Sequence, residues 1–159
     1  MKKIKGDSTI FDRCSIQSEK VLQSVMPIKV RFNEVDSMGI VWHGNYVEYL
    51  ELAREEFGRK YGLTYLGDIY ANGYYAPVVR VELDYKRMLG YQEEAFVRAT
   101  YVPTISSKVC FDYEIFTKGD DGREIIVATA KTIQVFTDLQ KNLVLENPVF
   151  YKKWKEKWL

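Results

Sequence analysis

Residues 31–54 of the chain read RFNEVDSMGIVWHGNYVEYLELAR, and the rest of the sequence is best interpreted outward from them. The stretch holds the single histidine, His43, and an acidic residue, Asp36, shortly before it. Asn45 is expected to cap a helix, and Glu48 follows at the spacing of a capping box. The stretch is therefore predicted to be an acidic loop that leads onto a helix N-terminus.

The predicted helix carries one apolar stripe and ends near Gly62, a residue type common just after helix C-termini. Its apolar residues recur at helical spacing: Tyr46, Tyr49, Leu50, Ala53, Phe57 and Tyr61. Glutamates, arginines and a lysine occupy the remaining positions. One long central helix with a single buried face is the expected result.

Around this helix the pattern changes to an alternation with period two, which is typical of half-buried strands. Strands are expected at 28–32, 79–85, 95–101, 109–115 and 125–137. The later strands are separated by short turns, including a hairpin loop at 118–122, and short turns favour antiparallel pairing. The predicted fold class is α+β, a curled antiparallel sheet of about five strands wrapped around one long helix.

Residues 1–26 are mixed and polar, and we expect an N-terminal appendage with a short helix through 18–25. This region has no apolar core of the kind that secretory signals contain. Cys14 and Cys110 match no metal or redox spacing, so two free thiols are favoured over a disulfide. No apolar run has the length of a membrane span, and a cytoplasmic location is expected.

Residues 147–159 are predicted to form a separate amphipathic helix, with Asn147 as its cap and Pro148 at its first position. Aromatic residues fall on one side and lysines on the other. Docking of the aromatics on the body is the favoured interpretation, and a weak contact with anionic membrane lipid is the alternative. Residues 27–146 then form the main domain.

The charge balance and the spacing of potential metal ligands support neither nucleic-acid binding nor metal binding. Lysine and arginine total 23, aspartate and glutamate total 22, and the net charge is +1. Such a balance gives no basis for nucleic-acid binding. One histidine with scattered acids makes no metal-ligand cluster, so no metal is expected.

The opening stretch resembles the 4-hydroxybenzoyl-CoA thioesterase family, including its acyl-CoA thioesterase branch, and the element order resembles the hotdog fold. The matching residues are Val30–Phe32, Asp36, Gly39–His43, Asn45–Tyr46, Tyr49–Glu51, Ala53–Arg54 and, more weakly, Leu83–Tyr85. The resemblance covers roughly residues 27–138. Residues 88–93 depart from it, because family members often have a proline and an Asp-containing turn there.

The resemblance implies two catalytic roles. An aspartate at the position of Asp36 is the catalytic carboxylate, and the backbone N–H at the position of His43 polarises the thioester carbonyl. The His43 imidazole has three open roles: transferring a proton, orienting Asp36, or orienting the leaving group. A helix N-terminus suits the developing oxyanion, because its first N–H groups lack partners and its dipole end is positive.

Three neighbours of His43 are candidate substrate contacts, and each also has a structural interpretation. Gly44 would let substrate approach the backbone. Asn45 is a helix cap first and a substrate ligand second. Trp42 is favoured as a core or interface residue over a wall of the acyl pocket.

Lys86, Arg87 and Lys108 lie near predicted strand ends and are candidates to bind the phosphates of coenzyme A, although ordinary solvated charges are the favoured interpretation. Coenzyme A would be part of the substrate, and no separate cofactor is expected.

The predicted function is an acyl-CoA thioesterase that releases a free acid and coenzyme A. The alternatives are an acyl-carrier-protein thioesterase, a hotdog dehydratase or hydratase, and a non-catalytic acyl-thioester binding module. A dehydratase would pair the histidine with an acid farther along the helix, and this sequence lacks that pattern. The resemblance and the need to cover a sheet edge imply a homodimer or homotetramer.

Overall fold

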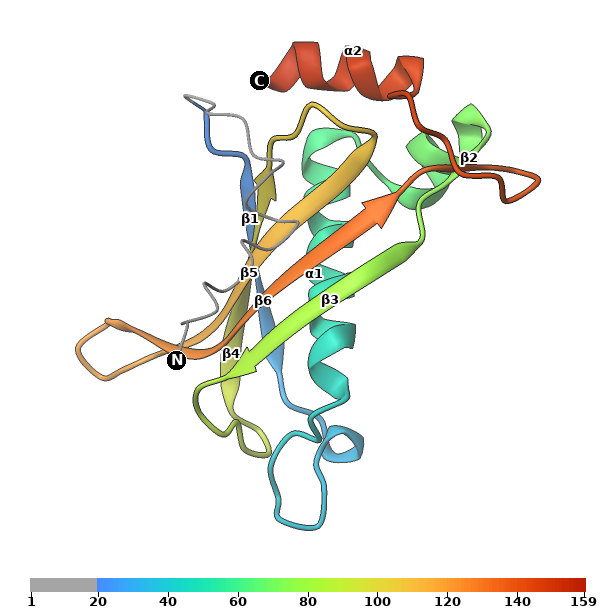
Figure 1. Ribbon diagram of the computed structural model, residues 1–159. Coiled ribbons are helices and arrows are strands. Elements are labelled where there is room, and N and C mark those ends of the chain that lie inside the picture. The colour runs from blue at the N-terminus through green and yellow to red at the C-terminus, as the bar shows by residue number, and fades with distance from the viewer. Residues whose placement is uncertain (1–19) are drawn as a thin grey trace, which may run out of the picture.

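A five-stranded antiparallel sheet curls around one long helix in the computed structural model, which describes residues 20–159 (Figure 1). Its strands run in the order β1-β4-β5-β6-β3. Their bounds are Gln23–Lys29 for β1, Val78–Tyr85 for β3, Glu94–Val102 for β4, Lys108–Lys118 for β5 and Glu124–Val135 for β6. Strands β2 (Tyr74–Tyr75) and β7 (Thr137–Asp138) form a separate small pair. The predicted α+β class and the five-stranded antiparallel sheet are confirmed.

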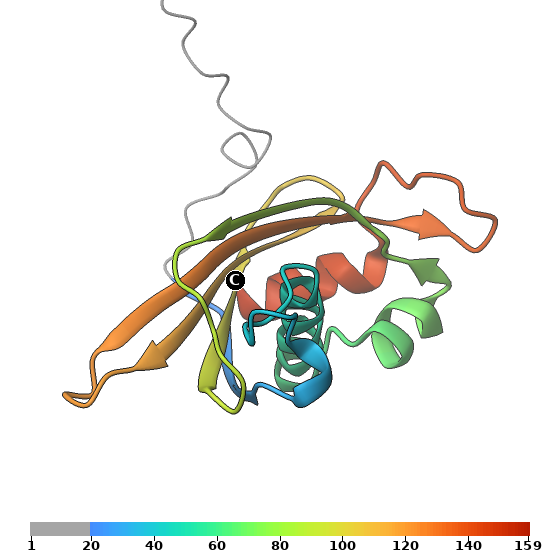
Figure 2. The ribbon, with the colours of Figure 1, turned by 90° about the horizontal axis from the view of Figure 1, so that it is seen from below.

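Helix α1, Asn45–Tyr61, lies in the hollow of the curled sheet, as Figure 2 shows along the sheet. Its predicted stripe is buried from Tyr46 through Phe57 and packs mainly on β1 and β4. Gly62 ends the helix at φ +74°, and its N–H donates to the Gly58 carbonyl at 2.8 Å. That left-handed conformation favours glycine, so the predicted helix stop is confirmed.

Strand β3 extends past the helix and leaves apolar side chains uncovered. The register aligns Leu83 with Ala130 of β6 and Tyr113 of β5, so these residues share the inner face of the sheet. On the same face of β3, Val81 is 40% exposed and Tyr85 is 49% exposed. We call the inner face of β3 the overhang, because among residues 20–159 its side chains are more exposed than those on the inner faces of β1 and β4, where α1 mainly packs.

The first strand begins earlier than the sequence pattern predicted. It spans Gln23–Lys29, not 28–32, and pairs with β4 along its whole length. The alternation was in the correct phase, since Ser24, Ile28 and Val30 are all buried. The described part of the helix expected over 18–25 is also wrong, because residues 23–25 are extended. In the sequence, Pro27 argues against a strand, because proline has no backbone N–H. Strand β1 is an edge strand, where the missing N–H is tolerated.

Helix α2, Val149–Trp158, lies across the C-terminal end of α1 (Figure 1), and its aromatic side docks on the body, as predicted. Tyr151 and Trp154 are buried, and the Trp154 indole N–H donates to the Tyr61 carbonyl at 2.8 Å. The predicted cap is wrong: Pro148 precedes the helix, and the Asn147 amide donates to the Ile105 carbonyl instead.

Cys110 is buried on β5, and Cys14 lies outside the described residues. Neither α1 nor α2, nor any other helix within residues 20–159, is long and apolar enough to cross a bilayer.

Candidate active site

The loop that carries Asp36 folds back on itself between β1 and α1. Val35 pairs with Val41, and the Asp36 N–H donates to the Ile40 carbonyl at 2.8 Å. Gly39 makes the turn at φ +74°, a conformation that other residue types rarely adopt. The loop closes because its alternating apolar residues pair across it, and Asp36 is held near its tip.

The Asp36 side chain is half-buried and has one oxygen available. Its Oδ1 accepts the Met38 N–H at 2.8 Å, which fixes the rotamer. Its Oδ2 accepts no hydrogen bond from any residue of the described part. A carboxylate with one oxygen held and the other open can attack a carbonyl carbon or take a proton from water.

Glu34 forms the base of the loop, and sequence reasoning missed it. Its side chain is 2% exposed, and its carboxylate accepts hydrogen bonds from the Arg31 backbone and guanidinium at 2.7–2.8 Å and from the Tyr49 hydroxyl at 2.9 Å. Its carbonyl accepts the Trp42 N–H at 2.8 Å and the Asn45 amide at 3.0 Å. The opposite charges of Arg31 and Glu34, three residues apart before a helix, were the available sequence signal.

These contacts set two pKa values in opposite directions. Burial alone would raise the pKa of Glu34, but the hydrogen bonds from Arg31 and Tyr49 outweigh it, and that pKa lies below its ordinary value. Burial, together with the Glu34 carboxylate, raises the pKa of Tyr49. At neutral pH the carboxylate is therefore the acceptor and the phenol the donor.

The helix starts without a side-chain cap, which corrects one prediction. Gly44 occupies the cap position, Asn45 is the first helical residue, and no side chain caps α1. Asn45 instead donates back to Glu34, and Glu48 lies 3.3 Å from the Arg31 guanidinium. The positive end of the helix dipole therefore stays open beside the Asp36 loop.

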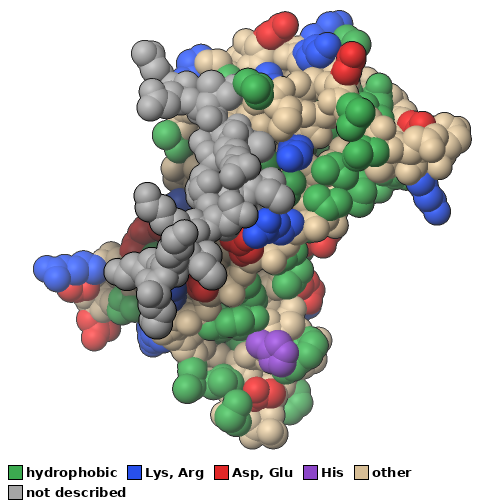
Figure 3. All heavy atoms as spheres, in the orientation of Figure 1, with side chains coloured by type: hydrophobic (Ala, Val, Ile, Leu, Met, Phe, Trp, Pro, Cys, Tyr) green, Lys and Arg blue, Asp and Glu red, His purple; other side chains and the backbone are tan. Residues whose placement is uncertain are grey.

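His43 is exposed at the end of the molecule, where Figure 3 shows the single histidine among apolar and acidic side chains. Its carbonyl accepts the Tyr85 hydroxyl at 2.8 Å, and its ring lies 4.9 Å from the Trp42 ring. No acceptor among residues 20–159 takes its backbone N–H. That N–H is one residue past the Glu34–Trp42 hydrogen bond, and Asp36 is two residues from its other end.

Trp42 and Gly44 depend on each other. The Trp42 indole is half-exposed and lies where a Cβ on residue 44 would be, so any larger residue would clash with it. The absence of a side chain at Gly44 thus makes room for the Trp42 indole. The open side of Gly44, where substrate was expected to approach the backbone, faces that indole.

The three predicted phosphate-binding cations do not meet in one copy of the chain. Lys86 and Arg87 directly follow β3, at the end of the strand where Tyr85 contacts His43. The Arg87 guanidinium bonds Thr117 at 3.0 Å and Glu93 at 3.2 Å. Lys108 begins β5 at the opposite end of the sheet, beside Tyr151 of α2. Within one subunit, Lys108 therefore lies apart from Lys86 and Arg87.

A cavity of about 680 Å³ lies between the second half of α1 and the sheet, and sequence reasoning did not foresee it. Its apolar lining residues are Leu63, Leu66, Ile69, Ala76, Pro77, Val78, Val109 and Phe111. Arg54, which is largely buried, and Glu51 line it from α1, with their charged groups 3.6 Å apart. The cavity meets the sheet at the beginning of β3, whereas His43 contacts the end of β3.

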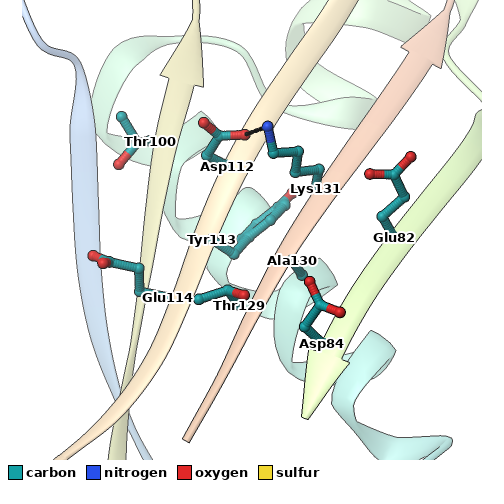
Figure 4. A pocket seen from close by; sticks show the side chains of 9 residues that line it. All are labelled: Glu82, Asp84, Thr100, Asp112, Tyr113, Glu114, Thr129, Ala130 and Lys131. Atoms are coloured by element: carbon teal, nitrogen blue, oxygen red, sulfur yellow. Dashed lines mark ion pairs between the residues drawn. The ribbon is translucent and has the colours of Figure 1, made fainter. Parts of the chain in front are cut away.

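A second hollow, of about 380 Å³, lies on the outer face of the sheet (Figure 4). Four acidic residues from two strands, β3 and β5, line it: Glu82, Asp84, Asp112 and Glu114. Lys131 lies 3.9 Å from Asp112. The acidic majority disfavours the phosphates of coenzyme A, so this hollow is not the candidate site.

Comparison with known proteins points to one family. The family model described as the Thioesterase-like superfamily matches residues 30–155. The Bacillus subtilis (strain 168) protein named "Putative acyl-CoA thioesterase YneP" is 34% identical over 108 residues, which cover 68% of this chain and 76% of that protein.

Two solved structures are similar over most of the chain. DHNA-CoA thioesterase from Staphylococcus aureus has a TM-score of 0.71 at 25% identity and covers 84% of this chain and 87% of its own. The 4-hydroxybenzoyl CoA thioesterase from Pseudomonas sp. strain CBS-3 has a TM-score of 0.71 at 20% identity, over 83% and 98% of the two chains. The second likeness concerns the fold, and it agrees with the strand order and central helix described above.

Proposed function

Because the chain belongs to the thioesterase-like superfamily, and so is a thioester hydrolase with the hotdog fold predicted from its sequence, we propose that it hydrolyses acyl-CoA to a free acid and coenzyme A. The observation that carries the proposal is the open Asp36 oxygen beside the uncapped start of α1. A thioester needs little more than these two features, because its thiolate leaves readily.

In this mechanism the substrate carbonyl oxygen lies against the His43 N–H and the first turn of α1. Asp36 acts as a general base, taking a proton from water whose oxygen adds to the carbonyl carbon. Alternatively, Asp36 attacks the carbon itself, and water then hydrolyses the anhydride. In both routes the C–S bond breaks. In the first route Asp36 passes the proton from water to the leaving thiolate; in the second the thiolate leaves and takes its proton from solvent water. One well-aimed oxyanion donor contributes on the order of 10²–10³ in rate.

Thiol release from a panel of acyl-CoAs, run with and without the Asp36→Asn substitution, tests this function. We expect Asp36→Asn to lower kcat/KM by at least about 10²-fold, because the amide can neither attack nor accept the proton. Asp84→Asn, on the outer face of the sheet, is the matched control and should keep wild-type turnover. Wild-type turnover by Asp36→Asn would disprove the mechanism.

His43→Ala separates the two candidate roles of residue 43. The variant keeps the backbone N–H, so we expect it to retain far more activity than Asp36→Asn. A loss as large as that of Asp36→Asn would instead assign an essential role to the imidazole: proton transfer, or the orientation of Asp36 or the leaving group.

The panel also decides between the competing activities. Aromatic, short and long acyl-CoAs and acyl-carrier-protein thioesters would reveal the preferred substrate. Enoyl absorbance without thiol release would indicate a dehydratase or hydratase, and saturable binding without turnover a binding module. For coenzyme A itself we propose Lys86 and Arg87 as phosphate contacts, since both follow β3 near His43.

We further infer that two copies pair through β3. The strand is an edge of the sheet, and an edge presents unpaired backbone groups. Val81 and Tyr85 of its overhang form an exposed apolar surface beside that edge. Two-fold antiparallel pairing would cover this surface and continue the sheet. A homotetramer would then join two such dimers.

The same pairing would complete the site. It places Tyr85 of one copy, which contacts His43, opposite the Val78 end of its partner, where the cavity lies. An acyl group held at Asp36 would then extend toward the partner's cavity. Light scattering on the wild type and on Val81→Lys tests this: the variant should lose both dimer and activity. A wild-type monomer with full activity would contradict it.

A further inference from the structure

We propose that Glu34 is a positioning residue for the reaction: its buried carboxylate holds the Asp36 loop against the first two turns of α1, so that the Asp36 oxygen and the His43 N–H face the same carbonyl. The proposal rests on the function proposed above and extends it to a residue with no contact to substrate.

The first argument is that Glu34 joins the loop to the helix twice. Its carboxylate accepts the Tyr49 hydroxyl at 2.9 Å, and its carbonyl accepts the Asn45 amide at 3.0 Å. The same carbonyl closes the loop on the Trp42 N–H at 2.8 Å. Residues 36 and 43 each lie within two residues of this closure. Any shift of Glu34 therefore moves the attacking group relative to the oxyanion donor.

The second argument concerns the cost of a buried charge. A carboxylate that is 2% exposed loses its hydration, and an apolar side chain of similar size would fill the space with less loss. Arg31 compensates it by binding Oε1 through Nε and Nη2, at 2.8 and 2.7 Å. Because a buried ion pair adds little net stability, the defined geometry of these hydrogen bonds is the better reason for a carboxylate here. Here the geometry that they define is that of the Asp36 loop.

The test is a double-mutant cycle between Glu34→Gln and Asp36→Asn, followed by single-turnover thiol release with enzyme in excess. We expect Glu34→Gln to lower kcat about 10- to 100-fold with KM nearly unchanged, because small misplacements of reacting groups cost this much. In the Asp36→Asn background the same substitution should lower the residual rate by a clearly smaller factor, because the part of the effect that acts through Asp36 is already lost.

A matched pair of tyrosine variants separates positioning from simple destabilisation. Tyr49→Phe removes one hydroxyl from Glu34 and should lower kcat in the same direction as Glu34→Gln. Tyr101→Phe removes another buried hydroxyl, which lies 2.6 Å from the Tyr151 hydroxyl at the far end of α1. We expect Tyr101→Phe to lower the unfolding temperature but not kcat. Tyr49→Phe also tests the proposal if Glu34→Gln does not fold.

Three outcomes would overturn the proposal: wild-type kcat in Glu34→Gln, equal rate losses in both backgrounds of the cycle, or an equal loss of kcat in Tyr101→Phe. Each leaves the proposed function intact if Asp36→Asn is inactive. Failure of the function itself is seen separately, as wild-type turnover by Asp36→Asn.

Discussion

Different kinds of interaction hold the two ends of α1 in place. At its C-terminal end, aromatic rings interlock beneath α2, with ring centroids 4.9 Å apart for Phe57 and Phe111 and 5.0 Å for Tyr101 and Trp154. At its N-terminal end, hydrogen bonds to Glu34 hold the chain together. Exposed apolar side chains surround that end: Phe32, Met38, Trp42 and Met88.

This difference indicates that stability and chemistry depend on opposite ends of one helix. Packed rings exclude water and stabilise the fold through buried area. Directional hydrogen bonds fix the positions of a few polar atoms and leave others open, which is what a reactive site needs. Exposed apolar side chains at the N-terminal end fit a surface that a substrate or a second copy covers.

The largest expected difference in stability between the two ends is seen when one tryptophan at each end is replaced. Trp154→Ala should lower the free energy of unfolding by about 3–5 kcal/mol, because the ring is buried and its N–H is bonded. Trp42→Ala should cost less than about 1 kcal/mol, because the indole is half-exposed. Urea unfolding measures both, and equal losses would show that the two ends are equally important for stability.

An intermediate effect is expected at the helix start. Gly44→Ala should cost about 1–3 kcal/mol, because the new Cβ meets the Trp42 indole. In a Trp42→Ala background the same change should cost almost nothing, since the backbone at Gly44 has φ −68° and suits alanine. A cycle of four unfolding curves gives the coupling, and purely additive losses would exclude the clash.

The smallest expected effect is a dependence of stability on pH, and it comes from Glu34 at the N-terminal end of α1. The pKa of Glu34 is lower in the folded chain than its ordinary 4.5, so the ionised group adds stability above that value and loses it as pH falls through the folded-state pKa. Between about pH 7 and pH 3.5, wild type should therefore lose more melting temperature than Glu34→Gln. Parallel melting curves for both proteins would refute this.

Periodicity was sufficient to predict most of the fold. The stripe from Tyr46 to Phe57 and the alternation of β4 each bury one face, and burial of one face is what the patterns encode. The exact start of β1 was not encoded in the same way. Phe32 continued the apolar alternation but is 77% exposed, because the chain turns before it into the loop.

A site residue could be predicted only where its neighbours in the sequence indicate its role. Asp36 stands out because its loop precedes a helix. The role of Glu34 depends on a hydrogen bond to Tyr49, and Asn45 was expected to cap the helix but bonds to Glu34. The cavity depends on packing between α1 and three strands, which no local pattern describes.

The strand order has a consequence for how the chain folds. Strands β4, β5 and β6 are joined by short turns, so their pairings close small loops, whereas β1 and β3 reach the two edges from far upstream. Because distant contacts carry a larger entropic cost, we expect the central meander to form early and both edges late. The edge that carries the overhang would then be newly formed when it first meets a second copy, which favours assembly soon after folding.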